Sequence, residues 1–514
     1  MMKTKSFHFI LFLLLSILLL SATLSLCHHD HDHNLRQCRE RCEEKQKYQQ
    51  KRCLRDCQEK YGGTGWESTE EERERSTHEY NSRWEEEQQE QQQNNPYFFD
   101  EDSFNDRFRT QEGYIRVSQR FSKKSKLLQG FDNYRFSFFE ANPHTFVVPN
   151  HIDAEYILYV VKGKGTISLV NQENRETYSL ERGDVLRIPA GTMLNVVNRD
   201  GKQKLQFAEF FQSISVPGKF RDYIGMGGQN PESYFNSFSG EVLQAAFNTP
   251  RDQIQRLFGQ QKKGMIIKAS EEQIKAISKH ASESHQKRKG KSSGGPFKLL
   301  QKSPVHSNKY GKLIQVDGND YNQLQDLDMS VTFTNITKGG MMAPFYNTKS
   351  SRFVMVVKGQ GYFEMACPHI SKTQQRGQRT QEQEETEQEG VHYQRISAQL
   401  RPRTAFVIPA GHPTTIIASN NENLQMVVYG INVRDNQKNF LAGKENVMNQ
   451  ISREAKELGF NVEATEVEEI FNNQKESFFL PGPQQQQQQQ QKQQKGEDGV
   501  HHVPLSSIYD FAAF

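Results

Sequence analysis

One stretch of this sequence occurs twice. Residues 154–165 read AEYILYVVKGKG and are followed by Arg-Ile-Pro-Ala-Gly at 187–191, whereas residues 352–361 read RFVMVVKGQG and are followed by Val-Ile-Pro-Ala-Gly at 407–411. The copies are too far apart for a short-period solenoid, and each has enough chain to bury its own core. The sequence therefore predicts two tandem copies of one domain.

Each copy is rich in short β-type segments. In the first copy these segments are residues 134–140, 145–148, 157–161, 165–170, 185–188 and 205–211. Turn sequences such as Gly163-Lys164-Gly165 separate them at short intervals. This spacing predicts a mainly β fold built as an antiparallel barrel or jelly roll.

A helical pattern follows each set of strands. In the first copy Thr249 and Pro250 form a helix start ahead of an apolar face, and Gly259 ends it. The apolar positions of the two copies correspond as Ile254 with Val467, Leu257 with Ile470, and Phe258 with Phe471. We therefore expect each barrel to be followed by a helical arm.

The amino terminus is typical of a secretory signal peptide over residues 1–27. Lys3 and Lys5 precede an apolar run from Phe9 to Leu20, which small residues then follow. The run is short for a membrane span, so we expect a soluble protein that passes through the oxidising endoplasmic reticulum.

Four cysteines lie in the segment 28–63, which has good helix propensity. They are Cys38, Cys42, Cys53 and Cys57, in two Cys-x3-Cys pairs. Residues four apart share a helix face, so two antiparallel helices can be linked by Cys38–Cys57 and Cys42–Cys53. Geometry favours this nested pairing among the three possible ones. A zinc site is the alternative, although it is disfavoured in a secreted chain.

Polar segments explain the low mean hydropathy of −0.82. We expect a Glu/Gln-rich disordered linker at 64–107, a basic glycine-rich linker at 285–295, a solvent loop at 373–390 and a Gln-rich tail at 481–514. The ordered modules are then 108–284 and 296–480. The net charge of +3 gives no indication of nucleic-acid binding, and the short basic linker lacks interleaved aromatic residues.

These motifs together resemble a known family. The Gly-x-Gly turn and the Gly-Asp-x3-Ile-Pro-Ala-Gly segment at 183–191 resemble the two consensus motifs of the cupin superfamily. Two such modules with helical arms resemble the vicilin-type (7S) seed storage globulins. The segments 112–117, 335–337 and 341–344, and the Cys-x3-Cys extension, agree with that resemblance.

Cupin enzymes hold a metal on three histidines and one glutamate, and most of these ligands are replaced here. The four places hold Pro149, His151, Tyr156 and Leu194 in the first copy, and Phe345, Asn347, Arg352 and Thr414 in the second. Glu155 is one residue out of register and should point to the opposite face of its strand. The resemblance thus implies a protein without catalytic residues.

Copper is the cofactor that the second copy suggests. Cys367 and His369 lie two residues apart, and His412 follows the second Pro-x-Gly turn. A thiolate with two imidazoles is a ligand set that selects copper. Some vicilins carry copper on such residues, with a tyrosine from the opening segment for which Tyr114 is the candidate here. The alternative is a buried cysteine beside ordinary histidines.

The resemblance implies a non-catalytic seed storage protein that forms homotrimers through its arms, is deposited in vacuolar protein bodies and is mobilised by proteolysis. Some relatives are food allergens. The segment 28–63 also resembles α-hairpinin peptides that contact microbial membranes or proteases, and a defence-peptide precursor is therefore an alternative function. The terminal residues 508–514 resemble a vacuolar sorting signal, and Asn335 lies in an N-glycosylation sequon.

Overall fold

The structure is a computed structural model that describes residues 95–286, 295–368 and 393–485. All of these residues belong to one compact unit, 88–514. The predicted signal peptide, the cysteine hairpin with both disulfides, the loop 373–390 and the sorting signal lie outside the described residues, as does most of the linkers and the tail. We call residues 108–284 module 1 and residues 296–480 module 2.

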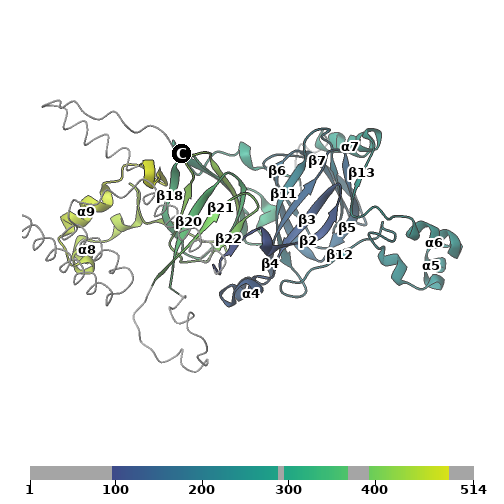
Figure 1. The fold of residues 1–514 in the computed structure, drawn as a ribbon, viewed down its shortest axis with the longest axis horizontal. Helices are drawn as coiled ribbons and strands as arrows, with labels where there is room; N and C mark the ends of the chain where they lie inside the picture. Colours follow the sequence, from purple (N-terminus) through teal and green to yellow (C-terminus); the bar gives the residue numbers. More distant parts are fainter. Residues whose placement is uncertain (1–94, 287–294, 369–392, 486–514) are drawn as a thin grey trace, which may run out of the picture. The chain divides into compact units, whose positions relative to one another are not determined.

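The described strands of module 1 form two antiparallel sheets (Figure 1). One has the order β14-β9-β6-β11-β4-β3-β2, and the other has the order β12-β5-β10-β7-β8, with β13 also paired to β5. The strands are β2 (Phe104–Thr110), β3 (Gly113–Ser118), β4 (Tyr134–Ala141), β5 (Thr145–Ile152), β6 (Ala154–Lys162), β7 (Lys164–Val170), β8 (Arg175–Glu181), β9 (Asp184–Ile188), β10 (Met193–Asn198), β11 (Leu205–Ser213), β12 (Asp222–Tyr223) and β13 (Ile266–Lys268).

Module 2 repeats this architecture. Its sheets have the orders β1-β22-β19-β24-β17-β16-β15 and β21-β20-β23-β18-β25, with β26 also paired to β18. The strands are β1 (Phe98–Phe99), β14 (Phe297–Lys298), β15 (His306–Asn308), β16 (Gly311–Val316), β17 (Met329–Ile336), β18 (Gly340–Asn347), β19 (Ser351–Lys358), β20 (Gly361–Cys367), β21 (Gln394–Leu400), β22 (Ala405–Ile408), β23 (Thr414–Ala418), β24 (Leu424–Ile431), β25 (Lys438–Phe440) and β26 (Phe479–Pro481). The predicted mainly β fold with two tandem barrels is confirmed.

The repeated glycines occupy turns that require them. Gly163 and Gly359 follow β6 and β19 with φ angles of 91° and 84°. A Cβ at these positions would lie 2.5 Å from the Lys204 oxygen and 2.1 Å from the Asn423 oxygen. Only glycine combines this backbone conformation with such a close approach. The repeat is therefore preserved where the barrel strand turns.

The two modules exchange short strands. β1 precedes module 1 in the chain but pairs with β22 of module 2, with Phe98 opposite Phe406. β14 begins module 2 but pairs with β9 of module 1, with Phe297 opposite Val185. The described strands thus begin within the range 64–107 that composition assigned to a linker. Buried Tyr97, Phe98, Phe99 and Phe104 supply apolar surface in a range that is otherwise mostly polar.

Aromatic rings fill the interface between the modules. Phe353 of β19 lies 4.7 Å from Phe210 of module 1 between ring centroids. It also contacts Phe121, Phe131, Tyr134 and Phe136 of module 1. The Tyr429 hydroxyl of module 2 donates a 2.7 Å hydrogen bond to the Ala208 oxygen of module 1. One hydrophobic core therefore extends from module 2 across this interface into module 1, and a second core fills the barrel of module 1.

A pair of short helices follows each barrel (Figure 1). These arms are α5 (Gly240–Phe247) with α6 (Arg251–Gly259), and α8 (Arg453–Phe460) with α9 (Ala464–Asn472). Ser239 and Ser452 cap α5 and α8, and Asn248 and Asn461 end them in the left-handed conformation. The predicted arms are confirmed.

Two further α-helices are described. α4 (Phe121–Lys124) is a single turn, and α7 (Glu271–Gln286) packs against β8 and β10. Within the described ranges no helix has both the length and the apolar character needed to cross a membrane.

Candidate functional site

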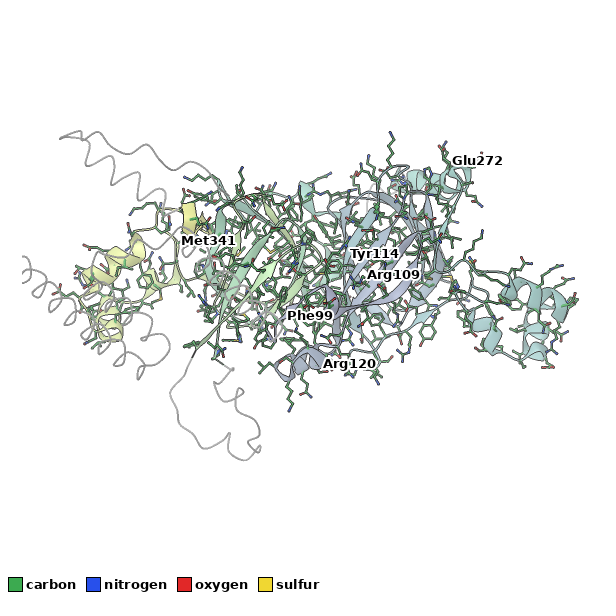
Figure 2. All side chains as sticks on the ribbon, viewed as in Figure 1. Phe99, Arg109, Tyr114, Arg120, Glu272 and Met341 are labelled. Carbon is green, nitrogen blue, oxygen red and sulfur yellow. The ribbon has the colours of Figure 1, made fainter. Side chains whose placement is uncertain are left out.

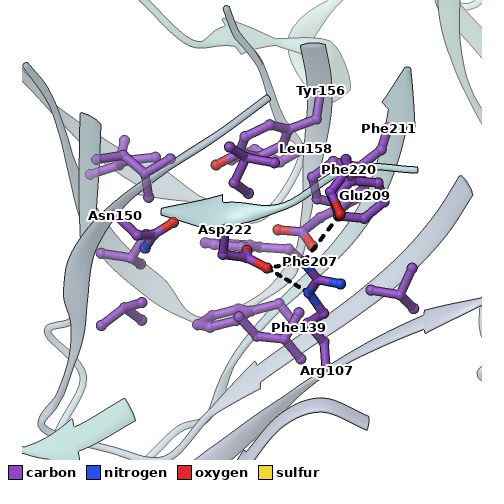
Figure 3. A pocket seen from close by; sticks show the side chains of 17 residues that line it. Arg107, Phe139, Asn150, Tyr156, Leu158, Phe207, Glu209, Phe211, Phe220 and Asp222 are labelled. Atoms are coloured by element: carbon purple, nitrogen blue, oxygen red, sulfur yellow. Dashed lines mark hydrogen bonds and ion pairs between the residues drawn. The ribbon is translucent and has the colours of Figure 1, made fainter. Parts of the chain in front are cut away.

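The barrel of module 1 encloses a small cavity of about 40 Å³ (Figure 3). Apolar side chains form most of its wall, and the polar groups include Arg107, Asn150, Glu209 and Asp222. Arg107 and Asp222 form an ion pair. The space is large enough for a few water molecules. Most of the barrel interior is thus filled with side chains.

Glu209 is buried in this wall with a nearby hydrogen-bond donor. The Ser137 hydroxyl donates to Glu209 Oε2 at 2.8 Å. Burial raises the pKa of the Glu209 carboxyl to about 7, and the neighbouring charge of Asp222 acts in the same direction. This carboxyl therefore takes up a proton when the protein folds at pH 5 to 6.

The places of the cupin metal ligands carry packing residues in module 1. Tyr156 and Leu194 line the cavity. The His151 ring stacks on Tyr223 at 5.0 Å between centroids. Glu155 instead accepts a 3.0 Å hydrogen bond from Arg187 Nε, and it does not line the cavity. The prediction that Glu155 and Tyr156 face opposite sides of the strand is confirmed.

The corresponding cavity of module 2, of about 30 Å³, has a cationic wall. Arg352 and Lys438 line it with Phe345 and apolar residues. Burial lowers the pKa of Lys438 to about 7, and the charge of Arg352 contributes. Asn347 and Thr414, the remaining former ligand places, are fully buried. The two barrels thus differ in the charges they enclose.

Cys367 and His412 lie together at one side of module 2. β20 alternates buried and half-buried residues, and Cys367 is one of the buried ones. Ala366 donates a 2.9 Å backbone hydrogen bond to the oxygen of Pro413, the residue after His412. His412 Nδ1 lies 3.1 Å from the Ala410 oxygen. Because a carbonyl only accepts, Nδ1 is the donor in this contact.

Tyr97 is the tyrosine at this place. Its ring centroid lies 5.9 Å from that of His412. Burial raises the pKa of the Tyr97 hydroxyl, and a side-chain hydrogen bond with Cys367 adds to the shift. The sequence did not identify Tyr97, because it follows a long polar segment. The one indication available was the change from that segment to Tyr-Phe-Phe at 97–99.

Tyr114, the predicted tyrosine, lies in a different cluster. It is opposite Arg109 on strands β3 and β2 (Figure 2), and its hydroxyl lies 3.4 Å from Glu140 Oε2. Arg403 of module 2 also pairs with Glu140 at 3.3 Å. Tyr114 therefore belongs to contacts that join the two modules, whereas Tyr97 takes the place expected beside Cys367.

The remaining predicted residues stay predictions. His369 lies outside the described residues, so its position beside Cys367 is not described. Among the residues that are described, no three His, Cys, Asp or Glu side chains gather closely enough to hold a metal ion. Asn335 is half-buried in β17, where it accepts a 3.2 Å hydrogen bond from Gln425. Its glycosylation would be checked by a mass shift on glycosidase treatment.

The sequence profile of the cupin family matches residues 105–255 and 297–468. These two ranges correspond to the two barrels and most of their arms. A match of this extent, repeated in each module, places both modules in the cupin family.

Relatives with high identity cover both modules. The chain is 47% identical to "Vicilin-like antimicrobial peptides 2-2" of Macadamia integrifolia over 81% of its length, and it spans 62% of that relative. It is 43% identical to "Vicilin Cor a 11.0101" of Corylus avellana, over 88% of this chain and 96% of the relative.

A solved structure agrees with this relationship. A crystal structure of the vicilin from Solanum melongena matches with a TM-score of 0.70 and 40% identity, over 76% of this chain and 98% of the other. That structure is described as revealing "different anionic ligands in structurally similar pockets". The chain therefore belongs to the vicilin (7S globulin) family of cupin proteins.

Proposed function

We propose that this protein is a seed storage globulin, a reservoir of nitrogen without turnover. The observation that carries the proposal is the vicilin relationship across both modules, together with Tyr156 and Arg352 in places where cupin enzymes bind a metal. Polar Gln- and Asn-rich segments add nitrogen to the barrels. A compact core with charged loops suits dense deposition and later proteolysis.

The amount of the protein during seed maturation and germination tests this function. Immunoblots of maturing and germinating seeds should show accumulation in vacuolar protein bodies, followed by loss during seedling growth. A protein whose amount stays constant after germination, or which accumulates equally in leaves, would contradict storage.

We also propose that copies of this chain assemble through the arms into a homotrimer. Leu257 of α6 and Ile470 of α9 occupy equivalent places in the two arms, and their side chains are 66% and 68% exposed. Phe247 and Phe460 are a second equivalent pair, both exposed. Apolar patches of this kind are typical of contact surfaces.

A defence-peptide role for residues 28–63 remains the alternative proposal. It is supported by the macadamia relative, whose name refers to antimicrobial peptides. Recovery of this segment as a separate disulfide-linked seed peptide would support it. Seeds that contain only the intact chain would favour storage alone.

We further propose a copper site in module 2. Cys367, His412 and Tyr97 supply a thiolate, an imidazole nitrogen and a phenol oxygen, and His369 would add an imidazole. These soft and borderline donors fit copper. The contact of His412 Nδ1 with the Ala410 oxygen would orient the ring, so that Nε2 would be the atom that binds the metal. Bound copper would provide one-electron redox chemistry.

Metal analysis tests the copper proposal. The purified wild type should contain close to one copper per chain, and Cys367→Ser should lose most of it. Tyr97→Phe should shift the visible absorption or spin-resonance spectrum of the bound metal. His144→Gln, on module 1, is the matched control and should change neither. Equal copper in the wild type and Cys367→Ser would contradict the proposal.

The cationic cavity of module 2 supports a third proposal, the binding of a small carboxylate such as acetate. Arg352 and Lys438 line the cavity, and the vicilin from Solanum melongena is described as holding anionic ligands. Because the Lys438 pKa is about 7, affinity for acetate should rise as the pH falls below 7. Acetate binding that is unchanged in Lys438→Met would contradict it.

A further inference from the structure

A cleft of about 380 Å³ lies on module 1, outside the barrel cavity. Its wall is formed by the start of β2, the end of β3, the segment before α4 with the end of that helix, the start of β4 and the loop that follows β11. Arg120, labelled in Figure 2, is on this wall. The cleft is about ten times larger than either barrel cavity.

Basic side chains dominate the wall of this cleft. The basic residues are Arg107, Arg120, Lys123, Arg135, Lys219 and Arg221, whereas Asp106 is the acidic residue on the wall. Asp106 already pairs with Arg109 and Arg116, which do not line the cleft. Arg107 is neutralised by Asp222. The wall therefore carries a clear excess of positive charge.

Two arginines meet at the inner end of the cleft. A Cβ at Gly218 would lie 3.2 Å from Arg135 Nη2 and 3.4 Å from Arg120 Nε, so the loop glycine is packed against both guanidinium groups. Arg120 pairs with Asp132 at 2.6 Å. The two oxygens of Asp132 also accept hydrogen bonds from Ser122. This end of the cleft thus has one carboxylate, that of Asp132, beside two guanidinium groups.

Buried donors in this cleft lack partners. Arg135 is only 6% exposed, and it donates from Nη2 to the Gly218 oxygen. In the part of the chain that the structure describes, neither Arg135 Nη1 nor Arg120 Nε has a hydrogen-bond partner, although both atoms are buried. An unsatisfied charged donor is costly to bury. An anion in the cleft would satisfy both donors and reduce the repulsion between the two guanidinium groups.

Charge and size define the class of anion. Within the described ranges, Lys123, Arg135, Lys219 and Arg221 form no ion pairs. Several positive charges around one cleft require a compact ligand with several negative charges. Phosphate groups carry up to about two charges each at neutral pH and match the planar donors of arginine. From this geometry we propose that the cleft binds a small anion with two or more phosphate groups.

Calorimetric titration with inorganic tripolyphosphate tests the site on the full chain. The wild type should bind one equivalent per chain, more tightly than it binds orthophosphate, and the affinity should fall as salt rises. The double variant Lys219→Gln/Arg221→Gln changes two exposed residues. It should bind about tenfold more weakly or worse, because charge-assisted hydrogen bonds are lost.

Two controls separate the cleft from other basic surface. Lys202→Gln removes one charge from an exposed turn of module 1 outside the cleft, and it should bind like the wild type. Arg135→Gln should weaken binding while its melting transition shows that it still folds. Absence of tripolyphosphate binding by the wild type would overturn the proposal. Equal affinity in the double variant and Lys202→Gln would also overturn it.

Discussion

Glu209 shows how a single buried carboxyl couples the first barrel to pH. Its neighbours are the Ser137 hydroxyl and the wall of a cavity of about 40 Å³. In the unfolded chain the carboxyl has its usual pKa of 4.5, and in the folded protein burial raises this pKa to about 7. The ionised form is therefore disfavoured inside the barrel, and stability falls as the pH rises from about 4.5 to about 7.

Replacing Glu209 by glutamine should remove this pH dependence. The free energy of unfolding of the variant, minus that of the wild type, should be about 3 kcal/mol larger above pH 7 than near pH 4. Urea unfolding at pH 4 and pH 8 measures the difference. Glu173→Gln, in an exposed turn, is the matched control. A Glu209→Gln effect that is the same at both pH values would contradict the argument.

The helical arms have apolar residues on two surfaces, one that is buried within the protein and one that is exposed. In α6, Ile254 and Phe258 are buried while Leu257 is exposed, and in α9 Val467 is buried while Ile470 is exposed. Each module buries only part of the apolar face of its own arm. The residue that stays exposed is at the equivalent position in both arms. This internal symmetry suits contact between an arm of one copy and an arm of the next.

Ile470→Asp should weaken self-association without unfolding the barrels. Burying a carboxylate in an apolar contact is unfavourable, so sedimentation should shift from the trimer toward the monomer at unchanged secondary structure. Thr465→Asp places the same charge on the exposed surface of α9 and serves as control. A variant that sediments like the wild type would exclude this part of the arm from the assembly.

At the scale of the whole molecule, the modules form a single cooperative structure. The exchanged strands β1 and β14 and the rings around Phe353 connect two barrels that the repeat alone presents as independent. Ion pairs such as Arg403 with Glu140 add polar contacts across the same interface. We therefore expect one calorimetric unfolding transition for both modules.

Phe353→Ala should uncouple the modules. Removing a fully buried ring costs about 3–5 kcal/mol. Here the lost contacts are with module 1, so the single transition should separate into two. Phe363→Ala removes an equally buried ring that stacks on Phe406 of its own module, at 4.3 Å, and should lower stability without separating the transitions. Similar thermograms for the two variants would contradict the shared core.

Local sequence patterns predicted many of the elements, although β2, β3, β8 and β10 were not among the predicted segments. The predicted strand 134–140 corresponds to β4, 165–170 to β7, and 205–211 to β11. The turn glycines and the capped arms also followed from residues within a few positions of one another. Such features depend on backbone conformation and side-chain alternation, which neighbouring residues determine.

The site could be predicted only in part. The sequence predicted Cys367 and His412 as copper ligands from their chemistry and their spacing around the second Pro-x-Gly turn, and this assignment stays a prediction. Tyr97 was missed because its place beside Cys367 depends on the pairing of β1 with β22, far away in the chain. The basic cleft has the same origin, since Arg107, Arg120, Arg135 and Lys219 come from four separate segments.

The sequence by itself determined the duplication, the barrel fold, the arms and the loss of the cupin metal ligands. Only the tertiary structure decided which strands the modules exchange, which charges each barrel encloses and where the cationic cleft lies. Turns and strand alternation are properties of short stretches of chain. Side-chain neighbours across a barrel depend on strand order and register, which bring together residues far apart in the chain.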